Sequence, residues 1–214
     1  MISQLRMLLL LLAATPVLAL EPITVLERRE LPLERAVSFT HRLVLTLAYL
    51  EGGGWAPEAI HAAARETGQI LGQCGIALEQ AQLVRVGAPA RFRDFFTPAS
   101  RELAHTLALR RPTIYFVSAT RQRPPFDAEA IGRGNSRSRP ELADTVWVTL
   151  ATRDLGIALA HELAHVLMDS GEHSEEPGNL MRDETAPAST RLTAEQCARI
   201  AGKGSENLLL TPSR

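Results

Sequence analysis

The sequence predicts an α/β (α+β) fold, in which helices cover a sheet whose strands pair largely in parallel. Runs of β-branched and apolar residues alternate along the chain with segments whose apolar residues recur every three or four positions. This alternation is typical of strands connected by helices. The chain has 214 residues, 45% of them hydrophobic, which suffices to bury one core. No internal repeat or low-complexity segment interrupts the sequence, and we therefore expect a single domain.

The first 19 residues have the features of a secretory signal peptide. Arg6 precedes an apolar run that starts at Met7, and residues 17–19 supply a site for cleavage after Ala19. The run is shorter than the roughly 20 apolar residues that a membrane span needs. We expect export to the periplasm or the cell exterior, with no stable membrane insertion after cleavage. An uncleaved amino-terminal anchor is the alternative.

The charge balance gives no reason to expect nucleic acid or an anionic membrane as a partner. The chain has 23 basic and 24 acidic residues. Removal of residues 1–19 takes away Arg6 alone among them, which leaves 23 − 1 = 22 basic residues and a formal charge of 22 − 24 = −2. A balance this close to neutral builds no strong field over the surface.

The two cysteines, Cys74 and Cys197, bear on the compartment and on the fold. Disulfides form and persist in oxidising compartments, so export makes one disulfide between the two the simplest expectation. Two separate buried thiols are the alternative.

The elements are predicted in chain order from local patterns. Residues 20–38 mix two prolines with several charges, and we expect an ordered lead-in segment or a mobile arm before a domain at 39–214. Strands are expected where apolar and β-branched residues gather, and helices where the apolar period is three to four. The expected elements are a strand at 39–49, a helix from Pro57 to about Gly72 or Gly75, a strand at 76–86, a helix at 98–109, and strands at 112–117 and 145–150.

Residues 119–140 break this rhythm, because prolines and glycines punctuate a segment with several arginines. We expect a loop or an irregular edge strand there. The arginines in question are Arg121, Arg123, Arg133, Arg137 and Arg139.

The helix expected after Asp154, which can act as its N-cap, carries the pattern with chemical content. His161 and His165 are four residues apart, so one helical turn places both imidazoles on one side, where they can bind the same cation. Glu162 lies beside them without needing to bind the metal, and can take a proton from water. Two histidines on an ordinary polar helix face are the alternative.

These residues resemble the metzincin clan of zinc metalloproteases. The resemblance rests on His161-Glu162-Leu163-Ala164-His165, on His173, and on Asn179-Leu180-Met181, which is similar to the Met-turn beneath the metal in those enzymes. The order of elements also fits, including a carboxy-terminal helix from near Thr193, where Gln196 completes a capping-box pattern. The resemblance implies a twisted mixed sheet with an active-site helix, a Met-turn and a carboxy-terminal helix.

For residues 39–214 the resemblance implies a catalytic domain that hydrolyses peptide bonds through a zinc-activated water. His161, His165 and His173 would bind Zn²⁺, Glu162 would act as the catalytic base, and Met181 would be structural. Peptides or proteins would be the substrates, lying along the edge segment before the last strand. That segment comprises Ile131, Gly132, Arg133, Gly134 and Asn135.

The third histidine departs from the family pattern. His-Glu-x-x-His-x-x-Gly-x-x-His would place glycine at 168 and histidine at 171, whereas this chain has Met168 and Gly171 there, and its next histidine is His173. We expect the helix to run about three residues further and to stop at Ser170-Gly171. The competing third ligands are Asp169, Glu172 and the more distant Glu184 or Glu195.

A second function class remains open at this point, a catalytically inactive protein of the same fold that binds a metal or a partner. Glu162 argues against it, because a purely structural metal site has no use for a carboxylate there. His41, His61 and His105 have no ligand-like neighbours in the sequence and are expected to be ordinary surface or partly buried residues.

Overall fold

The computed structural model describes residues 22–33, 38–121, 130–133, 140–183 and 186–213. Its helices are α1 (Pro57–Gly72), α2 (Thr97–Leu107), α3 (Leu155–Met168) and α4 (Ala194–Glu206), with 3₁₀ turns at Ala90–Phe92 and Pro140–Leu142. Its strands are β1 (Thr24–Leu31), β2 (His41–Leu50), β3 (Ile76–Gly87), β4 (Asp94–Phe95), β5 (Thr113–Phe116), β6 (Ala119–Thr120), β7 (Ala130–Arg133), β8 (Thr145–Val148) and β9 (Leu210–Pro212).

The main sheet is mixed, with the strand order β1-β3-β2-β5-β8-β7. The central pairs β3–β2, β2–β5 and β5–β8 are parallel, whereas β1 and β7 run antiparallel to their neighbours at the two edges. Strand β9 adds to the start of β2, where Leu210 lies opposite Leu43. Helix α1 connects β2 to β3 and helix α2 lies between β3 and β5, so these helices return the chain to the same end of the sheet, as parallel pairing requires.

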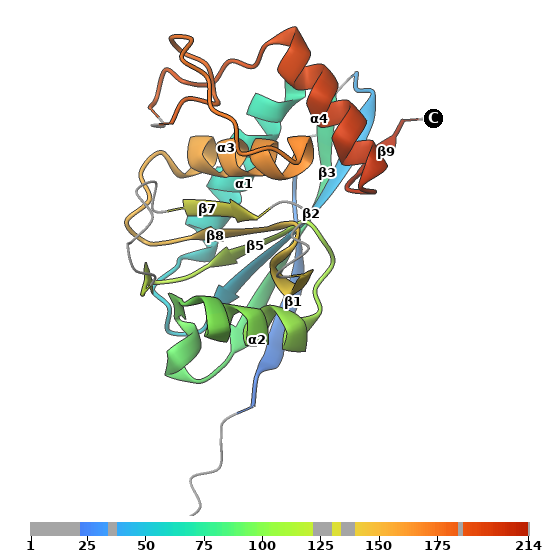
Figure 1. Cartoon of the computed structure of the whole chain (residues 1–214). Coiled ribbons are helices and arrows are strands. Elements are labelled where there is room, and N and C mark those ends of the chain that lie inside the picture. The colour runs from blue at the N-terminus through green and yellow to red at the C-terminus, as the bar shows by residue number, and fades with distance from the viewer. Residues whose placement is uncertain (1–21, 34–37, 122–129, 134–139, 184–185, 214) are drawn as a thin grey trace, which may run out of the picture.

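Helices cover both faces of the sheet, so the domain has three layers (Figure 1). Strand β5 and the residue after it, Val117, show how the sequence divides between the two faces. Ile114 and Phe116 belong to the core under α1 and α3, whereas Tyr115 and Val117 belong to the core under α2. All four side chains are buried, because successive residues of a strand point to opposite faces and both faces are covered.

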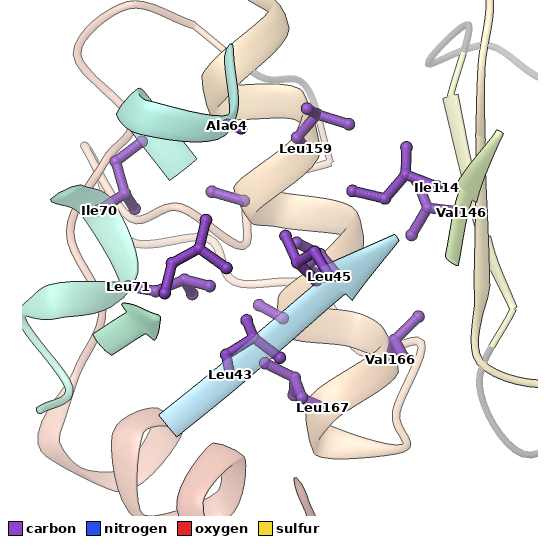
Figure 2. Packing of buried hydrophobic residues seen from close by; sticks show 14 of the residues in the cluster. Leu43, Leu45, Ala64, Ile70, Leu71, Ile114, Val146, Leu159, Val166 and Leu167 are labelled. Carbon is purple, nitrogen blue, oxygen red and sulfur yellow. The ribbon is translucent and has the colours of Figure 1, made fainter. Parts of the chain in front are cut away.

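The larger core lies between the sheet and the helices α1 and α3 (Figure 2). Leu45 of β2 points from the sheet toward these helices, with Leu71 of α1 and Leu159 of α3 among the side chains around it. Each is at most 1% exposed. Burial of a leucine side chain contributes roughly 1.5–3 kcal/mol, so this core is what fixes α3, and the residues it carries, against the sheet.

The predicted strands and helices are confirmed, with ends that differ by a few residues. Part of the lead-in segment at 20–38 is ordered, because residues 24–31 form β1 and pair with β3 along its length. The irregular segment at 119–140 contributes β7, an antiparallel edge strand beside β8. Gly134 and Asn135 of the expected substrate segment lie outside the described residues.

Two expectations about the motif helix were wrong. Asp154 precedes α3, but its backbone is left-handed (φ 45°) and its side chain makes no capping hydrogen bond. The helix also does not extend to Ser170-Gly171, because α3 ends at Met168 and Asp169 takes the left-handed conformation that turns the chain (φ 49°). Asp is among the few residues other than glycine that adopt this conformation at moderate cost.

A disulfide joins Cys74, directly after α1, to Cys197 in α4, as expected. The expected capping box of α4 is also present, since the Thr193 hydroxyl accepts from the backbone N–H of Gln196 and the Gln196 side chain accepts from the N–H of Thr193. Helix α4 is therefore held at its first turns by a covalent bond and by its own cap.

Candidate metal centre

The structure brings His161, His165 and His173 together. One potential ligand atom of each lies within 4.8 Å of those of the other two. The Nε2 atom of His165 is 2.9 Å from that of His161 and 3.2 Å from that of His173. Helix α3 supplies the first two residues one turn apart, and the loop after it returns His173 to the same point.

The other ring nitrogen of each histidine faces an oxygen atom. The Nδ1 atom of His161 is 2.8 Å from the Leu180 carbonyl oxygen, and that of His165 is 2.7 Å from the Ser170 carbonyl oxygen. A carbonyl only accepts, so each of these Nδ1 atoms carries the proton and donates it. The Nε2 atoms of both rings are consequently unprotonated and direct lone pairs at one another.

His173 follows the same arrangement with a carboxylate in place of a carbonyl. Its Nδ1 atom is 3.3 Å from Oδ1 of Asp183. An acceptor behind each imidazole fixes its tautomer and the plane of its ring, as is usual for metal-binding histidines. All three rings therefore present Nε2 to a common centre.

Burial keeps the two helix histidines neutral. It lowers the pKa of His161 below its usual value, and it lowers the pKa of His165 to about 4, with neighbouring His161 acting in the same direction. Imidazole rings whose Nε2 lone pairs converge repel one another unless a cation lies between them. Ligands 2.0–2.1 Å from a tetrahedral zinc ion lie about 3.4 Å apart, close to the Nε2 separations here, so the residues fit a metal ion.

The end of α3 determines both the orientation of His165 and the path to His173. The N–H of Asp169 donates to the Val166 carbonyl, and the N–H of Ser170 donates to the His165 carbonyl. With Asp169 left-handed, these two bonds form a Schellman motif. The motif places the Ser170 carbonyl against the His165 ring and directs the following residues back over the site.

The segment Asn179-Leu180-Met181, which was expected to resemble a Met-turn, lies against His161 and against Ser174, the residue after His173. Leu180 supplies the carbonyl that binds His161, and the carbonyl of Met181 accepts from the N–H of Ser174, directly after His173. Met181 itself is 1% exposed and belongs to the core that includes α3. Consecutive carbonyls of this turn thus hold one ligand and the neighbour of another.

Among the described residues, the competing ligands do not join the cluster. Glu172 forms an ion pair with Arg199 of α4 (2.7 Å), and Glu195 is exposed in the first turn of that helix. Asp169 serves as the turn residue of α3, and Glu184 lies outside the described residues. Glu162 is buried, 6% exposed, on the same helical turn as the two histidines.

The remaining histidines lie elsewhere. A ring nitrogen of His41 contacts the Thr40 hydroxyl, and one of His61 contacts the Pro32 carbonyl, while His105 is exposed near the end of α2. None of the three belongs to the candidate metal-binding group found among the described residues.

Sequence reasoning missed the oxygen atoms behind the rings. Two of them are backbone carbonyls, which leave no residue-type signal. Asp183 does leave one, because a carboxylate ten residues after His173, just past the Met-turn, is a candidate acceptor for a ligand imidazole.

The comparisons with known proteins bear on the fold. No family model and no curated protein sequence matches the chain. Among solved structures it is similar to metalloproteinase-II from Bacteroides fragilis, with a TM-score of 0.52 and 15% sequence identity over 80% of this chain and 55% of that one. This chain thus spans about half the length of the solved protein. The chain has the mixed α/β fold of a metalloproteinase, and its three clustered histidines are consistent with the His-Glu-x-x-His…His motif of the metzincins.

Proposed function

We propose that the chain is an exported zinc-dependent endopeptidase, with His161, His165 and His173 as the metal ligands and Glu162 as the catalytic base. The observation that carries the proposal is that the Nε2 atoms of three histidines converge, while the Nδ1 atom of each ring faces an oxygen acceptor. Three imidazoles leave one position of a tetrahedral ion open, which distinguishes a catalytic site from a closed structural one.

When bound, zinc supplies Lewis acidity, which makes a water molecule easier to deprotonate and polarises a peptide carbonyl. The chain's own contribution starts from His161 and His165, whose buried neutral rings are already deprotonated at Nε2 near neutral pH. Glu162 takes the proton of the attacking water on a carboxylate oxygen and then delivers it to the nitrogen of the leaving amine. One group thus acts as base and acid in turn, and no proton is gained or lost overall.

The position of the edge strand β7 favours a peptide as the substrate. It is the last strand of the sheet on the side of β8, and α3 follows β8 along the chain, so this edge and the histidine helix are neighbours (Figure 1). An extended peptide can pair with such an edge through main-chain hydrogen bonds, which gives affinity without demanding one sequence. Residues 131–135, expected to contact substrate, include three of the four residues of β7.

Export is part of the same proposal. The disulfide between Cys74 and Cys197 supports it, because structural disulfides belong to oxidising compartments. In the described part of the chain, no helix has the length and apolar character needed to cross a membrane.

The test measures zinc stoichiometry and cleavage of a peptide library by the full chain and three variants. Glu162→Gln keeps the shape of the side chain but cannot accept the proton, so we expect retained zinc and a loss of roughly 10²–10⁴-fold in kcat. His173→Ala is expected to weaken zinc binding. His105→Ala removes an exposed histidine away from the cluster and serves as the control, with both properties unchanged.

Full peptidase activity in Glu162→Gln would rule out the proposed mechanism. Zinc bound as tightly by His173→Ala as by the wild type would rule out the ligand assignment. Zinc binding by the wild type without cleavage of any peptide would instead favour an inactive metal- or partner-binding protein of this fold.

A further inference from the structure

We infer that Asn179 and Gln196 are positioning residues for the metal ligand His161, and that helix α4 acts through them on the metal centre. The inference rests on the proposed zinc site. Neither residue belongs to the histidine cluster. Their role follows from a chain of hydrogen bonds that runs from α4 to the His161 ring.

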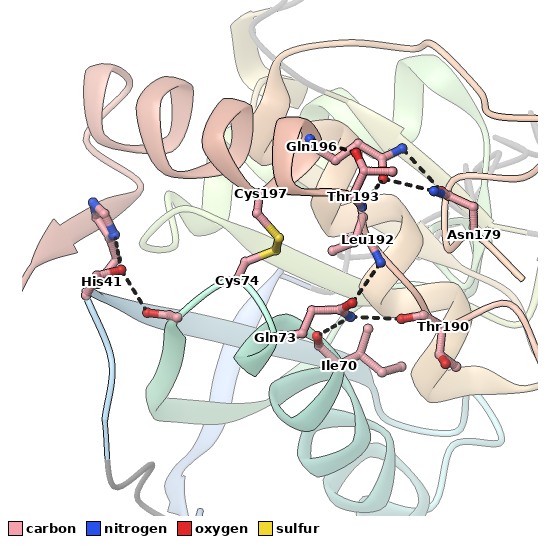
Figure 3. The surroundings of a disulfide bond; sticks show 12 residues. His41, Ile70, Gln73, Cys74, Asn179, Thr190, Leu192, Thr193, Gln196 and Cys197 are labelled. Carbon is pink, nitrogen blue, oxygen red and sulfur yellow. Dashed lines mark hydrogen bonds between the residues drawn. A yellow bond between two sulfur atoms is a disulfide. The ribbon is translucent and has the colours of Figure 1, made fainter. Parts of the chain in front are cut away.

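The first part of this chain is a reciprocal amide pair. Nδ2 of Asn179 donates to Oε1 of Gln196 (3.0 Å), and Nε2 of Gln196 donates to Oδ1 of Asn179 (3.2 Å) (Figure 3). Asn179 is only 2% exposed. A buried amide is costly when its donors and acceptor lack partners, so the pair fixes the orientation of the Asn179 side chain.

The second part connects Asn179 to the ligand. Its Oδ1 also accepts from the backbone N–H of Met181 (2.8 Å), two residues further along the chain. This bond bridges the peptide units around Leu180 and so fixes the direction of the Leu180 carbonyl. That carbonyl is the acceptor for Nδ1 of His161, so the orientation of the ring depends on the side chain of Asn179.

The third part anchors the pair to the body of the domain. Gln196 precedes Cys197, whose disulfide partner Cys74 follows Gln73. The Gln73 side chain donates to the Thr190 carbonyl (2.8 Å) and accepts from the N–H of Leu192 (2.7 Å) (Figure 3). Gln196 thus holds Asn179, Gln73 holds the backbone of residues 190–192, and the disulfide joins the two residues that follow Gln73 and Gln196.

Two substitutions at the start of α4 distinguish an effect on the position of His161 from an effect on the stability of the helix. Gln196→Ala removes the amide pair and half of the capping box, whereas Thr193→Ala removes the other half and leaves the amide pair intact. Each removes one side chain of the capping box at the start of α4, so Thr193→Ala controls for the loss of the cap. Gln196→Glu is the second variant, because it keeps the length and the acceptor oxygens but loses the donor to Asn179.

The readouts are the dissociation constant of Zn²⁺, measured by competition with a chromogenic chelator on folded protein, and the visible spectrum of the Co²⁺ form. We expect Gln196→Ala and Gln196→Glu to weaken zinc binding by about tenfold, the lower end for groups that orient a ligand, and to alter the Co²⁺ bands. Thr193→Ala should stay within about twofold of the wild type. These readouts need no activity.

Equal zinc affinity and equal Co²⁺ spectra for Gln196→Ala and Thr193→Ala would overturn the positioning role and leave the proposed zinc site intact. Failure of the wild-type protein to bind zinc would overturn the proposed function and this inference together.

Discussion

The burial of His165 makes the stability of the metal-free protein depend on pH. In the folded chain the pKa of His165 is about 4, because burial and neighbouring His161 disfavour the imidazolium, whereas an exposed histidine has a pKa of about 6.5. Between these values the unfolded chain binds a proton that the folded chain does not. The contribution of His165 to the free energy of unfolding is therefore complete above pH 6.5 and decreases as the pH falls toward 4.

The size of the effect follows from the two pKa values. Their difference of about 2.5, at about 1.4 kcal/mol for each pKa unit, corresponds to roughly 3 kcal/mol from His165. His161 is shifted in the same direction by burial and adds to it. Roughly 3 kcal/mol is a large share of the 5–15 kcal/mol that stabilises a typical domain, so the metal-free protein is expected to be markedly weaker at pH 4.5 than at pH 7.

Urea unfolding of chelator-treated protein, followed by tryptophan fluorescence between pH 7.5 and pH 4, measures this directly. His165→Gln replaces the imidazole with a neutral amide, so its stability should fall by roughly 3 kcal/mol less over that interval. His105→Gln, at an exposed position, should follow the wild type. The reasoning fails if the wild type and His165→Gln lose the same stability on acidification.

Three further predictions concern the scaffold and the site. Replacing Cys74 and Cys197 together by alanine opens a loop of 123 residues, and the loop-entropy relation gives a loss of about 5 kcal/mol, measurable by urea unfolding and refuted by an unchanged midpoint. Gly156→Ala places a Cβ atom 2.6 Å from that of Glu66 and should cost about 1–3 kcal/mol in thermal unfolding, whereas Gly72→Ala meets nothing within 4 Å and should not destabilise. Asp183→Ala should weaken zinc binding by less than about tenfold in chelator competition, because the Asp183 side chain is 85% exposed; a hundredfold loss would contradict this.

The elements predicted best are those in which buried apolar residues recur in a regular pattern along the sequence. The helical period at 57–72 and the wholly apolar run before Ser118 specify α1 and β5, because each must hide one or both faces. The edge strand β1 could not be inferred in this way, since most of its residues are exposed and it is held to β3 by backbone pairing and by polar contacts such as that of Arg28 with Gln82. Exposed strands carry little of the periodic signal on which such predictions depend.

In the site, the spacing of His161 and His165 was enough to predict that their side chains lie together, because residues four apart in a helix are on the same face. The supporting bonds could not be read in the same way. The contact of His161 with the Leu180 carbonyl and that of Asn179 with Gln196 join residues 17 to 19 positions apart. They depend on how the chain returns over α3, which no local pattern specifies.

The late position of His173 now has a structural explanation that differs from a longer helix. The family pattern has its helix-ending glycine at position 168, whereas here the left-handed residue is Asp169, so only one of the two extra residues lengthens the helix. The other lies in the loop between Asp169 and His173, where Gly171 has open space around it and an additional residue costs little. The carbonyl after the turn still contacts His165, and the N–H of Ser174 still reaches the Met181 carbonyl. Each end of the loop thus has a backbone group in a hydrogen bond, and the displaced histidine joins the cluster with His161 and His165.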